Sequence, residues 1–283
     1  MNYEEFKKNV IAELRGYLTE ELRDCEFCEE EVKKVNRILD GLTLVKPETE
    51  CGPTVYYQEV YEWFLRNGDF EKCMENIATF FEKGFEALKE TEPALYKVDD
   101  VKQIKQYVVL NLVNTERNDD LLKTVPHKTF HDLSVIYRCI VDNQRDNGIS
   151  TFVITNSLME HLNLDGQTLD SCAKRNMERL LPSSVDKVKD CIYLITNNLR
   201  IFGAAVMLDT EILKGLSNKM EDDLYILPSS IHEFFVIPVT GEDETYLKQI
   251  VKEANDSVVS DQDFLSNSLY RFDRDTESVE LVR

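Results

Sequence analysis

The segment PSSIHE brings together the residue types that nucleophilic catalysis requires. Hydroxyls at Ser229 and Ser230, the imidazole of His232 and the carboxylate of Glu233 follow directly after Pro228. An imidazole and a neighbouring acid can activate a hydroxyl. Strand alternation, however, places His232 and Glu233 on opposite faces. Three interpretations therefore stay open: a catalytic loop, a substrate-binding loop, and a turn whose serines bond to the backbone.

A second polar group lies in VPHKTFHDL, where His127 and His131 are four residues apart and Asp132 follows. On a helix this spacing would direct both imidazoles to one side, where they could hold a metal ion. Pro126 favours a turn, and the residues after His131 have a strand pattern. We therefore expect local hydrogen bonding by these residues, with no metal ion and no other cofactor.

Cys25 and Cys28 form a CxxC motif within DCEFCEEE. A structural zinc site needs a second ligand pair, and a reactive thiol needs nearby positive charge, whereas acids surround this motif. The sequence predicts two reduced thiols one turn apart on a helix. It contains no GxGxxG, GxxxxGK[ST], HExxH, GxSxG or EF-hand loop. We assign no catalytic residue, and the sequence favours a protein that is not an enzyme.

Apolar periodicity predicts a mainly helical N-terminal subdomain over residues 1–125 and an α+β subdomain over 126–283, closely associated or forming a single domain. Strands after residue 126 come as adjacent pairs with helices between them, which favours an antiparallel sheet of hairpins. The expected helices cover 3–35, 70–89, 99–113, 166–180 and 241–255. Within 36–45 the helix is expected to break at Asp40-Gly41 and to continue as a short strand. The other expected strands cover 129–142, 149–156, 191–198, 202–209, 224–230 and 232–239, with a hairpin turn at 146–148 and two final strands around 275–276.

The chain is strongly acidic. Its 53 Asp and Glu residues against 33 Lys and Arg residues give a formal net charge of −20. This charge argues against a protein that grips nucleic acid through its phosphates. Residues 221–283 hold 15 acids and 5 bases, half of the excess. A site at PSSIHE is therefore expected in negative surroundings that disfavour anionic substrates. No signal peptide or membrane-length apolar run is recognised, so we expect a cytoplasmic protein.

Several segments together resemble an uncharacterised family of Firmicutes, chiefly gut Clostridia, known as domain of unknown function 5688. The resemblance runs from about Leu42 to Leu281 and rests most specifically on LPSSIHE and VPHKTFHDL, supported by FGAAVMLD and FLSNSLYRFDRDT. Family members carry a Trp where Leu162 stands and a Leu where His131 stands. The element order is also similar, more remotely, to YtpQ-like proteins. The resemblance implies a bacterial source and a shared architecture, and it implies no reaction.

The leading hypothesis is a non-enzymatic acidic module that binds a basic protein partner. One form of it is an antagonist that mimics DNA on a basic, nucleic-acid-handling partner. The alternative is a hydrolase or a small-molecule-binding protein that uses the PSSIHE loop, and a third option is a structural module. We expect no direct binding to nucleic acid or membrane, and the sequence leaves the oligomeric state open.

Overall fold

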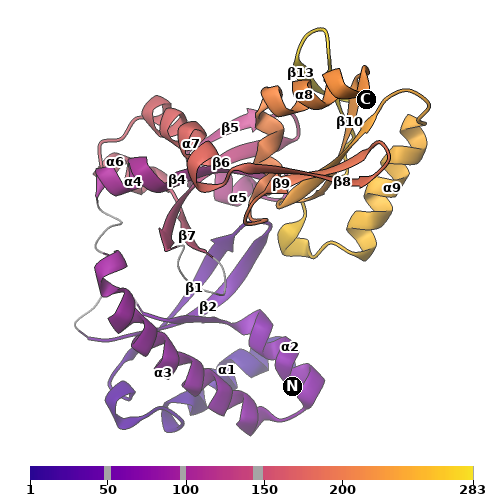
Figure 1. The fold of residues 1–283 in the computed structure, drawn as a ribbon. Helices are drawn as coiled ribbons and strands as arrows, with labels where there is room; N and C mark the ends of the chain where they lie inside the picture. Colours follow the sequence, from indigo (N-terminus) through magenta and orange to yellow (C-terminus); the bar gives the residue numbers. More distant parts are fainter. Residues whose placement is uncertain (48–51, 96–99, 143–148, 283) are drawn as a thin grey trace. The chain divides into compact units, whose positions relative to one another are not determined.

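The structure is a computed structural model that describes residues 1–47, 52–95, 100–142 and 149–282. Two compact units emerge from its internal contacts (Figure 1). The N unit comprises Met1–Lys34 and Ile38–Tyr96, and the C unit comprises Val35–Arg37 and Lys97–Arg283. Each unit buries a hydrophobic core of its own. The subdomain boundary expected after residue 125 stays a prediction.

In its described residues, the N unit combines three helices with a three-stranded sheet in the order β1-β2-β3. Helix α1 begins at a capping box, in which Asn2 accepts from the Glu5 backbone and the Glu5 carboxylate accepts from the Asn2 N–H. Its buried residues Phe6 and Val10 join the core of the unit. The elements are α1 (Tyr3–Glu13), 3-10 turns at Leu14–Gly16 and Glu20–Leu22, β1 (Glu26–Lys34), β2 (Arg37–Val45), β3 (Thr54–Tyr56), α2 (Tyr57–Asn67) and α3 (Phe70–Leu95).

The predicted helix over residues 3–35 is wrong beyond Glu13, because the chain returns as the edge strand β1. In β1 the carboxylates are exposed, whereas Phe27 and Val32 are half-buried. Hydrogen bonds to β2 stabilise this strand. The spacing of apolar residues within a segment cannot show that a neighbouring strand will pair with it, so the strand was not predicted. The CxxC motif is therefore not helical: Cys25 is buried just before β1 and Cys28 is exposed on it. The N-terminal part is α+β and not largely helical.

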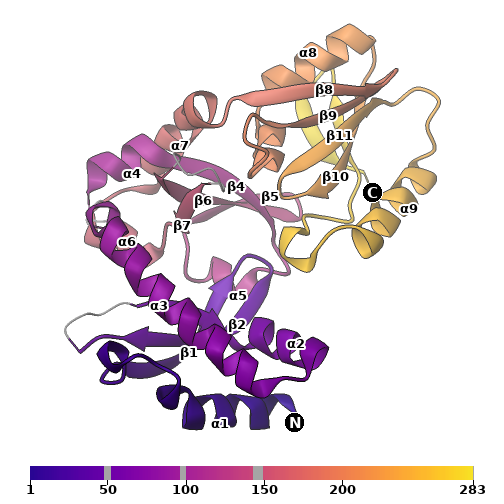
Figure 2. The ribbon, with the colours of Figure 1, turned by 60° about the horizontal axis from the view of Figure 1, so that its bottom comes forward.

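The C unit contains a four-stranded antiparallel sheet built around β6. Strand β4 pairs along one side of β6, while β5 and β7 pair with successive parts of the other side. Helices α4 and α7 pack on one face (Figure 2). The turn predicted at 146–148 lies outside the described residues. The elements are α4 (Val101–Tyr107), β4 (Val108–Asn114), α5 (Asp119–Leu122), β5 (His127–Phe130), β6 (Leu133–Asp142), β7 (Ser150–Val153), α6 (Asn156–His161) and α7 (Gly166–Leu180).

The rest of the C unit forms a six-stranded antiparallel sheet in the order β13-β12-β10-β11-β9-β8. Its inner face carries Ile226, Phe234 and Val236 into the main core. Helix α9 covers part of the outer face through Leu247. The elements are β8 (Ser183–Lys189), β9 (Ile192–Asn197), a 3-10 segment at Gly203–Leu208, α8 (Thr210–Met220), β10 (Leu224–Ser230), β11 (Glu233–Pro238), α9 (Glu244–Ser257), a 3-10 turn at Asp261–Asp263, β12 (Tyr270–Asp273) and β13 (Ser278–Leu281).

Two more predicted elements are corrected. The helix expected over 99–113 ends at Tyr107, where β4 begins; both faces of β4 are covered, so its residues lack the alternation of an exposed strand. The strand expected over 202–209 is the 3-10 segment Gly203–Leu208, whose small residues pack closely. The helices expected over 166–180 and 241–255 and the hairpin of 224–230 with 232–239 are confirmed.

The chain is thus an α+β protein with three antiparallel sheets in which helices and strands interleave throughout. Within the described ranges, no helix combines the length and apolar character that crossing a bilayer requires.

Candidate functional site

The PSSIHE segment forms the connection between β10 and β11. Strand β10 includes Pro228, Ser229 and Ser230, and β11 begins at Glu233. The Ser230 hydroxyl oxygen accepts a hydrogen bond from the His232 backbone N–H at 3.1 Å. This contact is the one expected of a serine that closes a turn.

Both nitrogens of the His232 imidazole are engaged. Nδ1 accepts from the backbone N–H of Phe202 at 3.2 Å, and Nε2 lies 3.3 Å from Oδ1 of Asp263. Because Nδ1 accepts a hydrogen bond, the neutral ring carries its proton on Nε2 and donates it to Asp263. Asp263 is itself held by the Ser260 hydroxyl at 2.7 Å. In this arrangement the imidazole has no nitrogen left to take a proton from a nearby serine hydroxyl.

The residues around Phe202 fit closely against this turn. Phe202 has a positive φ of 57°, and the following Gly203 approaches the His232 carbonyl so closely that a Cβ would lie 2.2 Å from its oxygen. The Thr196 hydroxyl donates to the same carbonyl at 2.8 Å, and Ala204 N–H donates to the Ile231 carbonyl. The turn is therefore held by hydrogen bonds from a segment about 30 residues earlier in the chain, through the Thr196 hydroxyl and the Ala204 backbone N–H.

A cation from the four-stranded sheet reaches this cluster. The Arg138 guanidinium carbon lies 5.0 Å from the centre of the Phe202 ring, and that ring stacks against His232 at 6.2 Å. The Arg138 Nε donates to the Thr151 hydroxyl at 2.9 Å, and burial lowers the pKa of the guanidinium to about 10. We call Arg138, Phe202, His232 and Asp263 the Arg–His cluster. The charge count for residues 221–283 predicted negative surroundings for this loop, and it did not take Arg138 into account, because Arg138 lies outside that stretch.

Sequence reasoning found one of the four members of this cluster, His232. Arg138 could have been noticed as a single base within the apolar strand pattern LSVIYRCIVD. Phe202 and Asp263 carry no local signal, because their role depends on which turn they contact.

His127, His131 and Asp132 do not form a chelating group. His127 is on β5 and its Nδ1 lies 3.1 Å from the Val125 carbonyl. His131 has a positive φ of 58° in the β5–β6 turn, and its Nε2 lies 2.9 Å from the Val279 carbonyl. In the part of the chain that the structure describes, no three His, Cys, Asp or Glu side chains are placed to hold a metal ion.

Asp132 instead accepts three hydroxyl hydrogen bonds. They come from Ser266 at 2.6 Å, from Ser268 at 3.0 Å and from the buried Tyr270. Two of the segments that carry the family resemblance, VPHKTFHDL and FLSNSLYRFDRDT, thus meet at this carboxylate. A carboxylate whose acceptor sites are taken by internal hydroxyls is a structural anchor and not a free acid.

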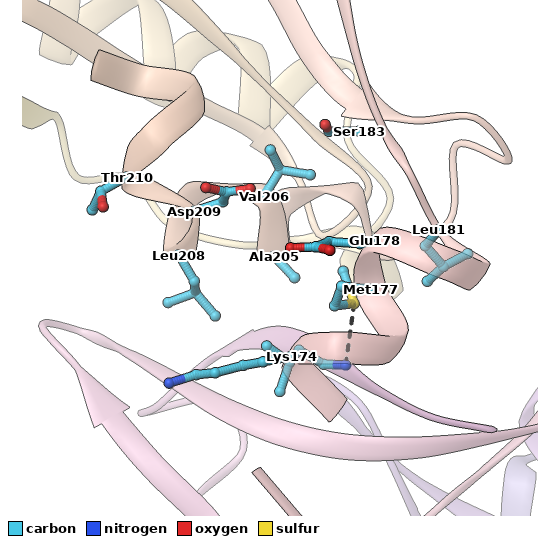
Figure 3. Close-up of a pocket in the computed structure, with 11 residues that line it drawn as sticks. Lys174, Met177, Glu178, Leu181, Ser183, Ala205, Val206, Leu208, Asp209 and Thr210 are labelled. Atoms are coloured by element: carbon cyan, nitrogen blue, oxygen red, sulfur yellow. Dashed lines mark hydrogen bonds between the residues drawn. The ribbon is translucent and has the colours of Figure 1, made fainter. Parts of the chain in front are cut away.

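A cavity of about 260 Å³ lies between α7 and the 3-10 segment Gly203–Leu208 (Figure 3). Its lining is apolar at Leu110, Met177 and Val206, and it also includes the carboxylates of Glu178, on α7, and Asp209, which follows the 3-10 segment. Asp209 also caps α8 by accepting from the Glu211 N–H. Lys174 also belongs to the lining, so two carboxylates and one ammonium group give the cavity a net charge of about −1, which favours a neutral or cationic group over an anion only slightly.

A second hollow, about 350 Å³, runs between α9 and the outer face of the six-stranded sheet. We call it the α9 groove. Tyr246 and Ile250, one turn apart on α9, are 60% and 37% exposed beside it. Glu233 shares a face of β11 with Phe235 and Ile237 in the floor of the groove. The groove is lined by Cys191, Ile192, Leu227, Phe235, Ile237, Pro238, Glu242, Tyr246, Leu247 and Ile250.

Comparison with known proteins gives a family and no activity. A model described as "Family of unknown function (DUF5688)" matches residues 3–193 and 187–274. No curated protein and no solved structure matches the chain. The family match begins at residue 3, whereas the resemblance recognised in the sequence begins at about Leu42.

Proposed function

The chain belongs to the DUF5688 family of unknown function, and we propose that it is a non-enzymatic acidic module that binds a basic, partly apolar segment of a partner protein. The observation that carries this proposal is the α9 groove. Its lining is mostly apolar, and two large side chains of α9 beside it are left open to solvent. Exposed apolar surface with a polar rim is typical of interaction sites.

The charge of the region favours a basic occupant. Apart from Cys191 and Ile192, the lining residues of the groove belong to residues 221–283, a stretch that holds 15 acids and 5 bases and includes the lining residue Glu242. An amphipathic helix with apolar residues on one side and Lys or Arg on the other would satisfy both features. A second copy of this chain is a less suitable occupant, because it would bring a net charge of −20 against another −20.

A second acidic stretch, in the N unit, supports the narrower form of the proposal, an antagonist of a nucleic-acid-handling protein. Seven carboxylates lie between Glu20 and Glu31, on and before the edge strand β1, and all of them are exposed. Over these twelve positions the only base is Arg23. An extended row of negative charge attracts a basic surface that would otherwise hold phosphates, and it repels nucleic acid itself.

The alternative function, a small-molecule-binding or hydrolytic role for the PSSIHE loop, is favoured by one observation. The Arg–His cluster places a guanidinium, an aromatic ring and an imidazole together around this loop. The hydrolytic version has less support, because both imidazole nitrogens are already engaged.

The experiment is a titration of the full chain into a dye-labelled amphipathic helical peptide with Leu on one face and Lys on the other, followed by fluorescence anisotropy. A matched peptide with Glu in place of Lys tests whether binding requires positive charge on the peptide. Ile250→Lys should weaken binding by about tenfold or more, since a central apolar contact is typically worth over 1 kcal/mol. Val258→Lys, which adds the same charge at an 83% exposed position outside the groove lining, should change it little.

Binding of the Lys peptide that falls with added salt and with Ile250→Lys supports the proposal. Equal binding of the Lys and Glu peptides, or equal loss in both variants, overturns it. Light scattering on the same samples detects self-association, and a dimer broken by Ile250→Lys would assign the groove to a second copy instead.

A further inference from the structure

A third cavity, of about 320 Å³, lies within the N unit, where β3, α2 and α3 supply its lining. Its volume is near the lower end of the range of about 300–1,000 Å³ that is typical of small-molecule sites. We call it the Trp63 cavity, after the single tryptophan of the chain. It is lined by the rings of Tyr56, Trp63 and Phe80 and by the buried side chains of Val55, Cys73 and Ile77, among others.

A tight connection between α2 and α3 brings two sides of this cavity together. Helix α2 ends at Gly68, which has a left-handed φ of 69°, and α3 begins two residues later at Phe70. Helices joined by so short a connection lie against each other as a helical hairpin. Ile77 and Phe80 are three residues apart on α3, a spacing that places both on the same side of the helix. The cavity is therefore part of the folded unit before any ligand binds.

The three aromatic rings give the cavity a preference for cations. Tyr56 and Trp63 are half-buried, and Phe80 is 46% exposed. The face of an aromatic ring carries partial negative charge, and among the three ring types Trp attracts a cation most strongly. The Lys34 ammonium already lies 5.2 Å from the centre of the Tyr56 ring. Among the described residues, no Lys or Arg lies over the ring of Trp63 or Phe80.

The other lining residues indicate which kind of cation fits. Glu59 is acidic, Thr54 and Asn76 are neutral, and no Lys, Arg or His is found among the described lining residues. A primary ammonium or guanidinium group would leave several N–H donors without acceptors in such an apolar lining, which is costly. A quaternary ammonium group has no N–H donor, and its methyl groups are themselves apolar. Aromatic rings around a cavity are the usual receptor for such a group.

We propose that the Trp63 cavity binds a small organic cation of the choline type, with its trimethylammonium group over the rings of Trp63 and Phe80. The methyl groups contact Val55 and Ile77, whose burial keeps that side of the cavity apolar. This site is separate from the α9 groove and does not depend on the protein-binding function.

The test is a titration of the full chain with choline chloride, followed by the fluorescence of Trp63, with sodium chloride keeping the ionic strength constant. The matched ligand is the neutral carbon analogue of choline, in which a tert-butyl group replaces the trimethylammonium group. We expect a saturable change with choline and about tenfold weaker binding of the analogue, a ratio that one or two cation–π contacts account for. Saturation-transfer NMR on the ligand methyl protons measures the same binding independently of the tryptophan.

One variant and a control complete the test. Phe80→Leu keeps an apolar side chain at a half-exposed position and removes the ring, so it should weaken choline binding by about threefold to tenfold and change binding of the neutral analogue little. Tyr246→Leu removes a 60% exposed ring beside the α9 groove and should leave choline binding intact.

Three results would overturn the proposal: no saturable response to choline in either measurement, equally tight binding of the neutral analogue, or a full preference for choline in Phe80→Leu. Equal binding of the two ligands would instead assign the cavity to uncharged apolar groups. The comparison of the two ligands on wild-type protein decides the question even where a variant fails to fold.

Discussion

The hydroxyl of Tyr270 donates a hydrogen bond to the carboxylate of Asp132, a residue 138 positions earlier in the chain. Asp132 lies in the β5–β6 turn of the four-stranded sheet, and Tyr270 begins β12 of the six-stranded sheet. The bond therefore joins the two sheets of the C unit. Tyr270 is fully buried, and this burial, together with the neighbouring Asp132 charge, raises the pKa of its hydroxyl. The phenol stays protonated, as a donor to a carboxylate must.

Removal of this hydroxyl should destabilise the C unit. Tyr270→Phe keeps the ring and deletes a hydrogen bond to a charged group, so the free energy of unfolding should fall by about 1–3 kcal/mol in urea denaturation followed by circular dichroism. Tyr193→Phe is the matched control, because its buried ring belongs to the same core and no hydrogen bond to its hydroxyl is found among the described residues. Similar stability losses in the two variants would contradict the assigned role of the Tyr270–Asp132 bond.

Gly203 should not tolerate even a methyl group. A Cβ there would lie 2.2 Å from the His232 carbonyl oxygen and 2.4 Å from the Thr196 hydroxyl oxygen. Gly203→Ala must push the 3-10 segment away from the PSSIHE turn, and we expect a loss of about 3 kcal/mol in the free energy of unfolding. Gly215→Ala, on α8, meets nothing within 4 Å and should gain about 0.5–1 kcal/mol. A neutral effect of Gly203→Ala in thermal denaturation would show that the two segments are not packed as described.

The N unit should lose stability in acid through Asp40. Hydrogen bonds from the Tyr3 hydroxyl at 2.8 Å and the Lys7 ammonium at 3.1 Å hold the pKa of Asp40 below its ordinary value. Because the folded pKa is the lower one, the stabilisation is present above the unfolded pKa of about 3.9 and is lost as the pH falls through the folded pKa. Trp63, the single tryptophan, lies on α2 of the same unit and reports its unfolding by fluorescence.

The variant Asp40→Asn isolates this effect. Its urea midpoint, followed by Trp63 fluorescence, should fall less between pH 5 and pH 3 than that of the wild type. Glu26→Gln removes an exposed carboxylate on β1 and should leave the wild-type acid dependence unchanged. An unaltered acid dependence in Asp40→Asn would rule out the proposed contribution of this carboxylate.

The sequence predicted helices and strands well where one face of a segment is buried and the other face is exposed to solvent. Helix α7 is such a case, since Leu169, Cys172 and Ala173 lie on one buried side of an otherwise polar segment. The sequence-based prediction failed where the neighbouring strands or helices decide whether a segment is helix or strand. The acidic strand β1 depends on pairing with β2, and β4 is covered on both faces, so neither shows the period that distinguishes strand from helix.

The candidate sites divide in the same way. The sequence by itself determined the negative charge, the segments that place the chain in its family, and PSSIHE as a turn between two strands. Only the tertiary structure decided that His232 is engaged by Phe202 and Asp263 and that Arg138 reaches the same cluster. The physical reason is that hydrogen bonding and desolvation depend on which groups are close in space, and each of these contacts joins segments that are distant in the chain.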